Sequence, residues 1–228
     1  MSVAVITGGS RGLGYALARE LSGREWDVVV DGRDADALSR SVASLPGRLV
    51  AVPGDVADEA HRIELARAAR RLGPLSLVVN NASVLGPSPM PTLDRYPLDE
   101  LEHVLRVNTI APLGLVQLLL PDLVGADGAV VNVTSDAAVE AYEGWGGYGA
   151  SKAALERLSA VLGAEQAGIR VYAFDPGDMR TRMHQDAFPG EDISDRPEPE
   201  TVVPALLRLL DERPPSGRYR ASDLLVTA

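Results

Sequence analysis

Tyr148 and Lys152 lie four positions apart in the segment YGASK, and Lys152 is the only lysine of a 228-residue chain that holds 21 arginines. On a helix, side chains at this spacing share one face. A tyrosine has an ordinary pKa of about 10, and a nearby cation stabilises its tyrosinate form. The pair therefore predicts a tyrosine that exchanges a proton near neutral pH, although an isolated Y-x-x-x-K pair is more typical of a surface helix.

Ser135 is a second polar side chain that such proton chemistry would use. It directly follows the apolar run 128–134 and precedes Tyr148 by 13 residues. A hydroxyl at the end of a strand can hydrogen-bond a substrate oxygen and stabilise its developing charge. Ser135, Tyr148 and Lys152 together fit the interconversion of a carbonyl and an alcohol.

A glycine-rich turn, TGGSRGLG, follows the first apolar run of the chain. Glycines let a backbone turn sharply and approach a ligand closely, and the N–H groups at the start of a helix bind anions. The turn predicts a site for a dinucleotide pyrophosphate, although a simple strand-to-helix connection would also use glycines. The residues expected to bind the cofactor here are Gly8, Ser10, Arg11, Gly12, Leu13 and Gly14.

The second apolar run ends in DGRD, residues 31–34. Many nucleotide-binding folds place an acidic residue at this strand tip to bind the ribose 2′-hydroxyl, whereas an arginine accommodates a 2′-phosphate. Register with the preceding valines assigns the tip to Gly32 and the next position to Arg33, which with Arg11 favours NADP(H). A shift of one residue would put Asp31 at the tip and favour NAD(H), and a solvated Arg33 is a further alternative.

Asp55 and Val56 follow the third apolar run in the segment GDVAD. They are candidates for contact with the adenine amino group and ring of the cofactor. A turn in which aspartate caps the next helix explains the same letters equally well.

Short apolar runs alternate with stretches of helical periodicity through most of the chain. Apolar strands separated by helices predict a doubly wound parallel sheet covered on both faces, with ligands beyond the carboxyl ends of the strands. The irregular segment 178–200 is expected to be a lid over the substrate. We expect strands at 3–7, 27–30, 48–52, 75–79, 128–134, 169–174 and 217–221, and helices at 12–22, 34–44, 57–71, 98–120, 147–167 and 200–212.

The length and composition predict one domain, residues 1–228, of a cytoplasmic protein. A net charge of −10 argues against a nucleic-acid partner, and the absence of cysteine excludes thiolate chemistry. Pro and Gly interrupt the longest apolar runs, so we expect no membrane span, and the start of the chain does not resemble a signal peptide. No group of metal ligands is expected.

The motifs, their order and their spacing resemble those of the short-chain dehydrogenase/reductase family. They are TGGSRGLG, NNAS at 80–83, Asn108, Ser135, YGASK and DPGDMRT at 175–181. The resemblance implies a three-layer Rossmann fold with strand order 3-2-1-4-5-6-7, a nicotinamide cofactor, and a homodimer or homotetramer. Ser83 departs from the family, which usually has glycine there.

The same resemblance implies a role for each matching residue. Tyr148 would be the general acid/base, Lys152 would also bind the nicotinamide ribose, Ser135 would position the carbonyl, and Asn108 would support a water-linked proton relay. The other cofactor contacts implied are Asn81, Ala82, Ser83, Pro176, Gly177, Met179 and Thr181.

The substrate is expected to be a small molecule bound beside these residues. Candidate contacts are Val84, Trp145, Met183 and Phe188, each of which core or lid packing would also explain. The sequence favours an NADPH-dependent carbonyl reductase. An NAD-linked alcohol dehydrogenase and a catalytically silent nucleotide-binding regulator are the alternatives.

Overall fold

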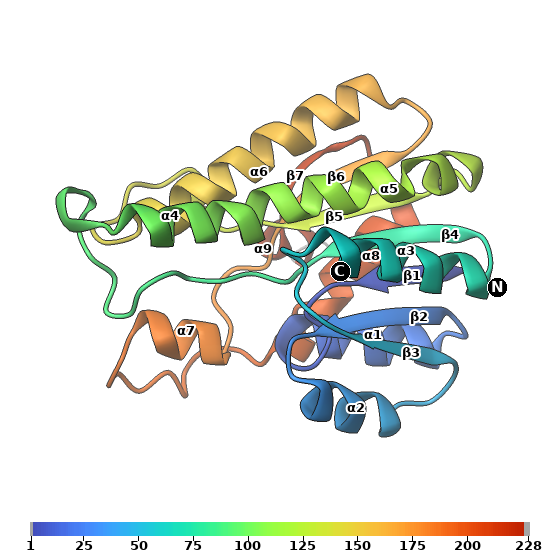
Figure 1. The fold of residues 1–228 in the computed structure, drawn as a ribbon, viewed down its shortest axis with the longest axis horizontal. Helices are drawn as coiled ribbons and strands as arrows, with labels where there is room; N and C mark the ends of the chain where they lie inside the picture. The colour runs from blue at the N-terminus through green and yellow to red at the C-terminus, as the bar shows by residue number, and fades with distance from the viewer. Residues whose placement is uncertain (1, 226–228) are drawn as a thin grey trace.

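A computed structural model describes residues 2–225 of the chain as a seven-stranded parallel sheet with helices on both faces (Figure 1). The strand order is β3-β2-β1-β4-β5-β6-β7, which confirms the predicted topology. The order reverses between β1 and β4, where doubly wound sheets bind their ligands. The strands are β1 Val3–Ile6, β2 Asp27–Gly32, β3 Leu49–Pro53, β4 Leu75–Asn80, β5 Ala129–Val133, β6 Arg170–Asp175 and β7 Gly217–Arg220.

The central strands are mostly apolar because both faces of the sheet are covered. In β1, Ala4 and Ile6 face a core completed by helices α1 Gly12–Gly23 and α8 Val203–Glu212. Val3 and Val5 face the opposite core, completed by α3 Glu59–Leu72 and α5 Ala111–Gly125. Because side chains alternate along each strand, each strand contributes to two separate hydrophobic layers, one on each face of the sheet.

The predicted helix 98–120 is divided by one widened turn. Helix α4, Leu98–Leu105, continues into a π-helical turn, Arg106–Ile110, and then into α5. Pro112 has no N–H to donate to the carbonyl of Asn108, so the regular α-helical ladder is interrupted here. The sequence pattern predicted the helix but not this turn, which contains Asn108.

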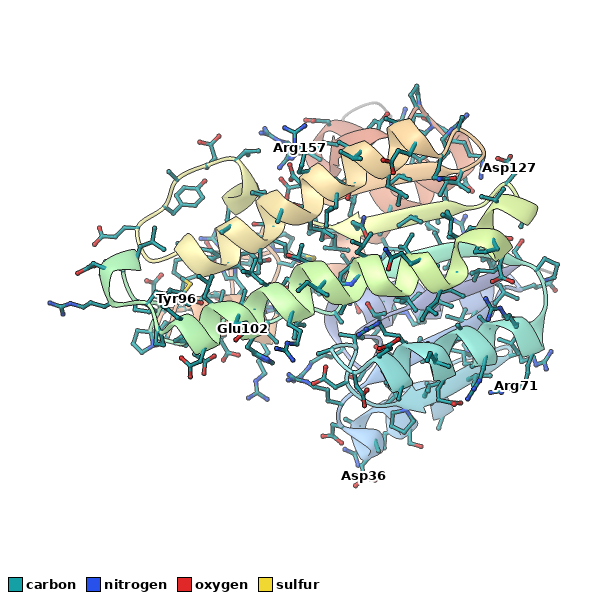
Figure 2. The ribbon with its side chains drawn as sticks, turned by 45° about the horizontal axis from the view of Figure 1, so that its top comes forward. Asp36, Arg71, Tyr96, Glu102, Asp127 and Arg157 are labelled. Atoms are coloured by element: carbon teal, nitrogen blue, oxygen red, sulfur yellow. The ribbon has the colours of Figure 1, made fainter. Side chains whose placement is uncertain are left out.

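The stretch Leu98–Gly125 is also long and apolar enough to cross a bilayer by length and composition alone. In this fold α5 packs against α3 and β4, and α4 packs against α6 Gly146–Glu165. Figure 2 shows α6 lying beside this stretch, with the labelled Glu102 and Arg157 projecting outward. Half of its apolar window is buried in the fold, whereas Leu98, Ile110 and Val124 are exposed.

The prediction of an irregular segment over 178–200 was only partly right. Helix α7, Arg182–Ala187, forms within it, capped by Thr181, whose Oγ accepts a hydrogen bond from the His184 N–H at 3.2 Å. A short 3₁₀ turn, Pro199–Thr201, follows, and α8 begins only at Val203. Two further helices complete the described chain, α2 Ala35–Ala43 and α9 Ala221–Leu225. The predicted last strand ends at Arg220 because residue 221 begins α9.

Candidate active site

A cleft of about 1000 Å³ lies beyond the carboxyl ends of the strands. Helix α7 and the start of α4 lie at this end of the sheet in Figure 1, and both contribute to its lining. The structure brings together here the following residues predicted for the site: Gly8, Ser10, Arg11, Gly12, Leu13, Arg33, Asp55, Val56, Asn81, Ala82, Ser83, Val84, Ser135, Trp145, Tyr148, Lys152, Pro176, Gly177, Met179, Thr181 and Met183. Gly14, Asn108 and Phe188 lie behind the lining.

Lys152 is buried beneath the cleft, with only 2% of its surface exposed. Its Nζ donates a hydrogen bond to the carbonyl of Val133 at 2.8 Å and lies 5.5 Å from the centre of the Tyr148 ring. Burial disfavours the charged form and lowers the pKa of Lys152 from 10.5 to about 8. The ammonium is thus held in place by a neutral carbonyl, next to the tyrosine.

Tyr148 has a raised pKa, contrary to the expectation that Lys152 would lower it. Burial of the phenol is the main cause, and the charges of Asp136 and Asp175 act in the same direction. Hydrogen bonds with Ser83 and Ser135 act in the opposite direction. Desolvation of the phenol therefore dominates, and the lowering expected from Lys152 is not seen.

Ser135 stands at the carboxyl end of β5, where it caps the 3₁₀ turn Asp136–Ala138. Its Oγ donates to Oδ1 of Asp136 at 2.9 Å and accepts from the N–H of Ala137 at 3.2 Å. The other carboxylate oxygen of Asp136 accepts from the hydroxyl of Tyr142 at 3.1 Å. Asp136 also lines the cleft, directly after Ser135.

Asn108 is 1% exposed, and its side chain is fully engaged in hydrogen bonds. Its Oδ1 accepts from the N–H of Val84 at 2.9 Å and from Oγ of Ser83 at 3.1 Å. Its Nδ2 donates to the carbonyl of Val84 at 2.9 Å and to Oγ of Ser151 at 3.0 Å. This side chain ties the segment after β4 to α6, so its own amide acts in positioning, and the predicted proton relay stays a prediction.

The glycine-rich turn has the geometry that an anion requires. Gly8 and Gly12 have φ angles of 69° and 59°, which disfavour any side chain. A Cβ on Gly14 would lie 2.5 Å from the carbonyl oxygen of Gly8 and 2.5 Å from Nδ2 of Asn81. Helix α1 begins at Gly12 without a side-chain cap or an acidic residue in its first turn. Its first N–H groups therefore suit a dinucleotide pyrophosphate.

Asp31 is not at the strand tip. It pairs with Val52 inside the sheet, and Gly32 pairs with the last residue of β3. The carboxylate of Asp31 is buried, accepting from the N–H of Gly8 at 2.6 Å and lying 3.1 Å from Nε2 of His61. Arg33 is exposed and lines the cleft. The pairing of β2 with β3 agrees with the assignment of Gly32 to the strand tip, which was made from the preceding valines. The contact between Asp31 and His61 was not predicted.

An apolar cluster lies beside Tyr148 in the cleft. Trp145 meets Tyr148 edge to face, with ring centres 5.8 Å apart, and Met183 packs in the same cluster. Phe188 lies behind Trp145, at 5.9 Å, and 4.9 Å from His184, so it supports the wall of the cleft from outside. Glu100 and His103 of α4 also line the cleft and were not predicted.

Within residues 2–225, no three His, Cys, Asp or Glu side chains form a group that could hold a metal ion. The cleft instead combines a glycine-rich turn at the switch point of a parallel sheet with a buried Tyr–Lys pair and a serine at a strand end. Fold and site together define a Rossmann-type, nucleotide-binding oxidoreductase.

A family model described as short chain dehydrogenase matches residues 2–192, and the chain belongs to the short-chain dehydrogenase/reductase family. Among curated relatives, the rhamnolipids biosynthesis 3-oxoacyl-[acyl-carrier-protein] reductase of Pseudomonas aeruginosa is 36% identical over 192 residues, covering 79% of this chain and 74% of that protein. Sepiapterin reductase of Meriones unguiculatus is 34% identical over 200 residues, covering 81% and 76%.

Solved structures agree with this membership. A short chain dehydrogenase from Pseudomonas syringae superposes with a TM-score of 0.89 at 30% identity, over 96% of this chain and 94% of that one. A short chain dehydrogenase from Shigella flexneri, solved in complex with NADP, gives a TM-score of 0.88 at 27% identity, over 97% of both chains. The chain is therefore an oxidoreductase of a family that uses NAD(P)(H) and small-molecule substrates.

Proposed function

We propose that this protein is an NADP(H)-dependent reductase that converts a ketone or aldehyde to an alcohol. The observation that carries the proposal is the convergence of Tyr148, Lys152 and Ser135 in one cleft with the uncapped, glycine-lined start of α1. The 3-oxoacyl-[acyl-carrier-protein] and sepiapterin reductases among its relatives support reduction of a carbonyl.

The bound nicotinamide would supply the hydride for this reaction. The chain's own residues would act on the substrate oxygen: the hydroxyl of Ser135 would hold it by a hydrogen bond, and the phenol of Tyr148 would donate a proton to it. Lys152, whose Nζ lies close to the Tyr148 ring, would stabilise the tyrosinate left behind. The N–H groups of the glycine-rich turn would bind the pyrophosphate.

The raised pKa of Tyr148 affects how the proposed reaction depends on pH. A phenol whose pKa is raised by burial is protonated at neutral pH, which is the form that donates a proton during reduction. The reverse reaction needs Tyr148 to lose its proton first, which this environment opposes. We therefore expect alcohol oxidation to require more alkaline conditions than carbonyl reduction.

The residues at the end of β2 support a preference for NADP(H). Both carboxylate oxygens of Asp31, which also lines the cleft, are already engaged, one by Gly8 and one by His61, and this disfavours a further bond to a ribose hydroxyl. Gly32 offers no side chain, whereas the exposed Arg33, with Arg11, would pair with a 2′-phosphate. The NADP complex of the Shigella flexneri relative is consistent with this choice. The cytoplasmic location and the homodimer or homotetramer remain predictions.

Two measurements test the proposal. Fluorescence titrations with NADPH and NADH should give tighter binding of NADPH, and Arg33→Ala should weaken NADPH at least tenfold with little effect on NADH. Arg40→Ala, an exposed arginine on the neighbouring α2, is the matched control. Equal binding of the two cofactors by the unmodified chain would overturn the preference.

The reaction itself is tested by following the loss of NADPH absorbance with a 3-oxoacyl thioester, sepiapterin and an aromatic ketone. We expect turnover of at least one carbonyl, abolished in Tyr148→Phe. Turnover that survives in Tyr148→Phe would refute the mechanism, and binding of NADPH without turnover of any carbonyl in a wide screen would favour the silent regulator.

A further inference from the structure

Arg218 of β7 lies behind the predicted site, and no motif in the sequence drew attention to it. Its Nε donates to Oε1 of Glu156 at 2.9 Å, and its Nη2 donates to Oδ2 of Asp175 at 2.8 Å. The same Nη2 lies 3.4 Å from the backbone carbonyl of Ser135. The side chains of Arg218 and Glu156 are partly buried, with 23% and 16% of their surface exposed, and that of Asp175 is buried, with 6% exposed.

Both carboxylates that hold Arg218 make a second contact toward the cleft. Glu156 of α6 accepts from the hydroxyl of Thr134 at 2.7 Å, one residue before Ser135. Asp175, the last residue of β6, accepts through Oδ1 from the N–H of Gly177 at 3.0 Å. A planar guanidinium with several fixed donors suits such a junction better than a single ammonium. One side chain on the last strand thus joins the ends of β5 and β6 to α6.

Asp175 matters electrostatically because its negative charge faces Tyr148 and raises the pKa of the phenol. The other charged groups around this tyrosine are Asp136 of the turn after β5, which acts in the same direction, and Lys152 of α6. Arg218 compensates the charge of Asp175 by a short ion pair. Without the guanidinium, a nearly buried carboxylate would stand uncompensated beside the general acid.

We propose that Arg218 is a positioning residue for the reaction proposed above: it holds the backbone of Ser135 in place and compensates the carboxylate of Asp175 behind Tyr148. The proposal rests on the proposed function for its kinetic consequences but not for the ion pair itself. It predicts two separable effects of losing Arg218, one on the placement of Ser135 and one on the proton of Tyr148.

The first experiment needs no substrate. Urea unfolding of the unmodified chain, Arg218→Met, Asp175→Asn and the double variant forms a double-mutant cycle. We expect the unfolding equilibrium constants of the two single variants to combine non-additively, with a coupling of at least tenfold, because Asp175→Asn removes the charge that Arg218→Met leaves unpaired. Additive effects would overturn the ion-pair part of the proposal even if no carbonyl were ever turned over.

The second experiment measures kcat against pH for oxidation, by NADP⁺, of the alcohol formed from the carbonyl that the chain reduces fastest. Oxidation requires deprotonated Tyr148, so a higher pKa moves the acid limb to higher pH. Arg218→Met should move this limb by about one unit, a tenfold loss of rate below the limb, and the added Asp175→Asn should move it back. Arg157→Met, at an exposed arginine of α6, is the control and should leave the profile unchanged.

Arg218→Lys separates the two roles and also serves if Arg218→Met does not fold. Lysine keeps a positive charge near Asp175, so we expect a nearly normal pH profile. It lacks the several fixed donors of a guanidinium, so kcat should fall at least fivefold while NADPH affinity stays unchanged. A pH limb in Arg218→Met that matches that of Arg157→Met, or full kcat in Arg218→Lys, would overturn the proposal. Absence of turnover in the unmodified chain would instead refute the proposed function. The double-mutant cycle measured by urea unfolding would still test the ion pair between Arg218 and Asp175.

Discussion

Replacing Lys152 with methionine should change how the stability of the protein depends on pH. Burial lowers the pKa of Lys152 from 10.5 to about 8, so the folded chain releases this proton at a lower pH than the unfolded chain does. Between these two pKa values the unfolded state binds more protons, and the free energy of unfolding therefore rises with pH. At 1.36 kcal/mol per pKa unit, the rise between pH 7 and pH 10 is about 2.5 kcal/mol.

Methionine has a similar length but no charge, so Lys152→Met should lack this rise. The free energy of unfolding, measured by urea denaturation, should favour the variant over the unmodified chain by about 2.5 kcal/mol more at pH 7 than at pH 10. The lost hydrogen bond to Val133 adds a penalty that is the same at both pH values. Effects of other titrating groups cancel in the comparison of the two proteins.

Arg157→Met is the control, because it removes an exposed cation from the same helix (Figure 2). Its effect on the free energy of unfolding should be nearly the same at pH 7 and pH 10. If the difference between Lys152→Met and the unmodified chain were equally independent of pH, the pKa of Lys152 would not be lowered in the folded chain, and the prediction would be refuted.

Three further predictions concern activity and cofactor binding. Lys152→Arg should fold but lose at least 90% of kcat, since a forked guanidinium does not match the space in which Nζ meets a single carbonyl; near-normal turnover would contradict this. Ser83→Gly removes a hydrogen bond that lowers the pKa of Tyr148, so the acid limb of alcohol oxidation should move upward by about half a unit to one unit. An unmoved limb would show that Ser83 serves only Asn108. Gly14→Ala should weaken NADPH binding at least tenfold in a fluorescence titration, because its Cβ would lie 2.5 Å from Gly8 and the turn must shift; unchanged affinity would mean that the turn does not bind the cofactor.

The fold was largely predictable because its signals are local. Apolar runs such as 3–6 and 75–79 are buried on both faces, and their alternation with helical periodicity led directly to the observed sheet order once the family motifs were added. The misses have equally local reasons. The π-helical turn depends on one proline within an apolar helix, and α7 is a six-residue helix in a segment rich in charges and proline.

The sequence by itself determined the residue types that chemistry needs: a glycine-rich turn, a serine at a strand end, and a Tyr–Lys pair one helical turn apart. Only the tertiary structure decided how these groups behave. The raised pKa of Tyr148 follows from its burial, and the engagement of Asp31 follows from the register that brings it to Gly8 and His61. The junction at Arg218 joins residues 43 and 62 positions away in the chain. Desolvation and ion pairing depend on such distant neighbours, which no local pattern of residues encodes.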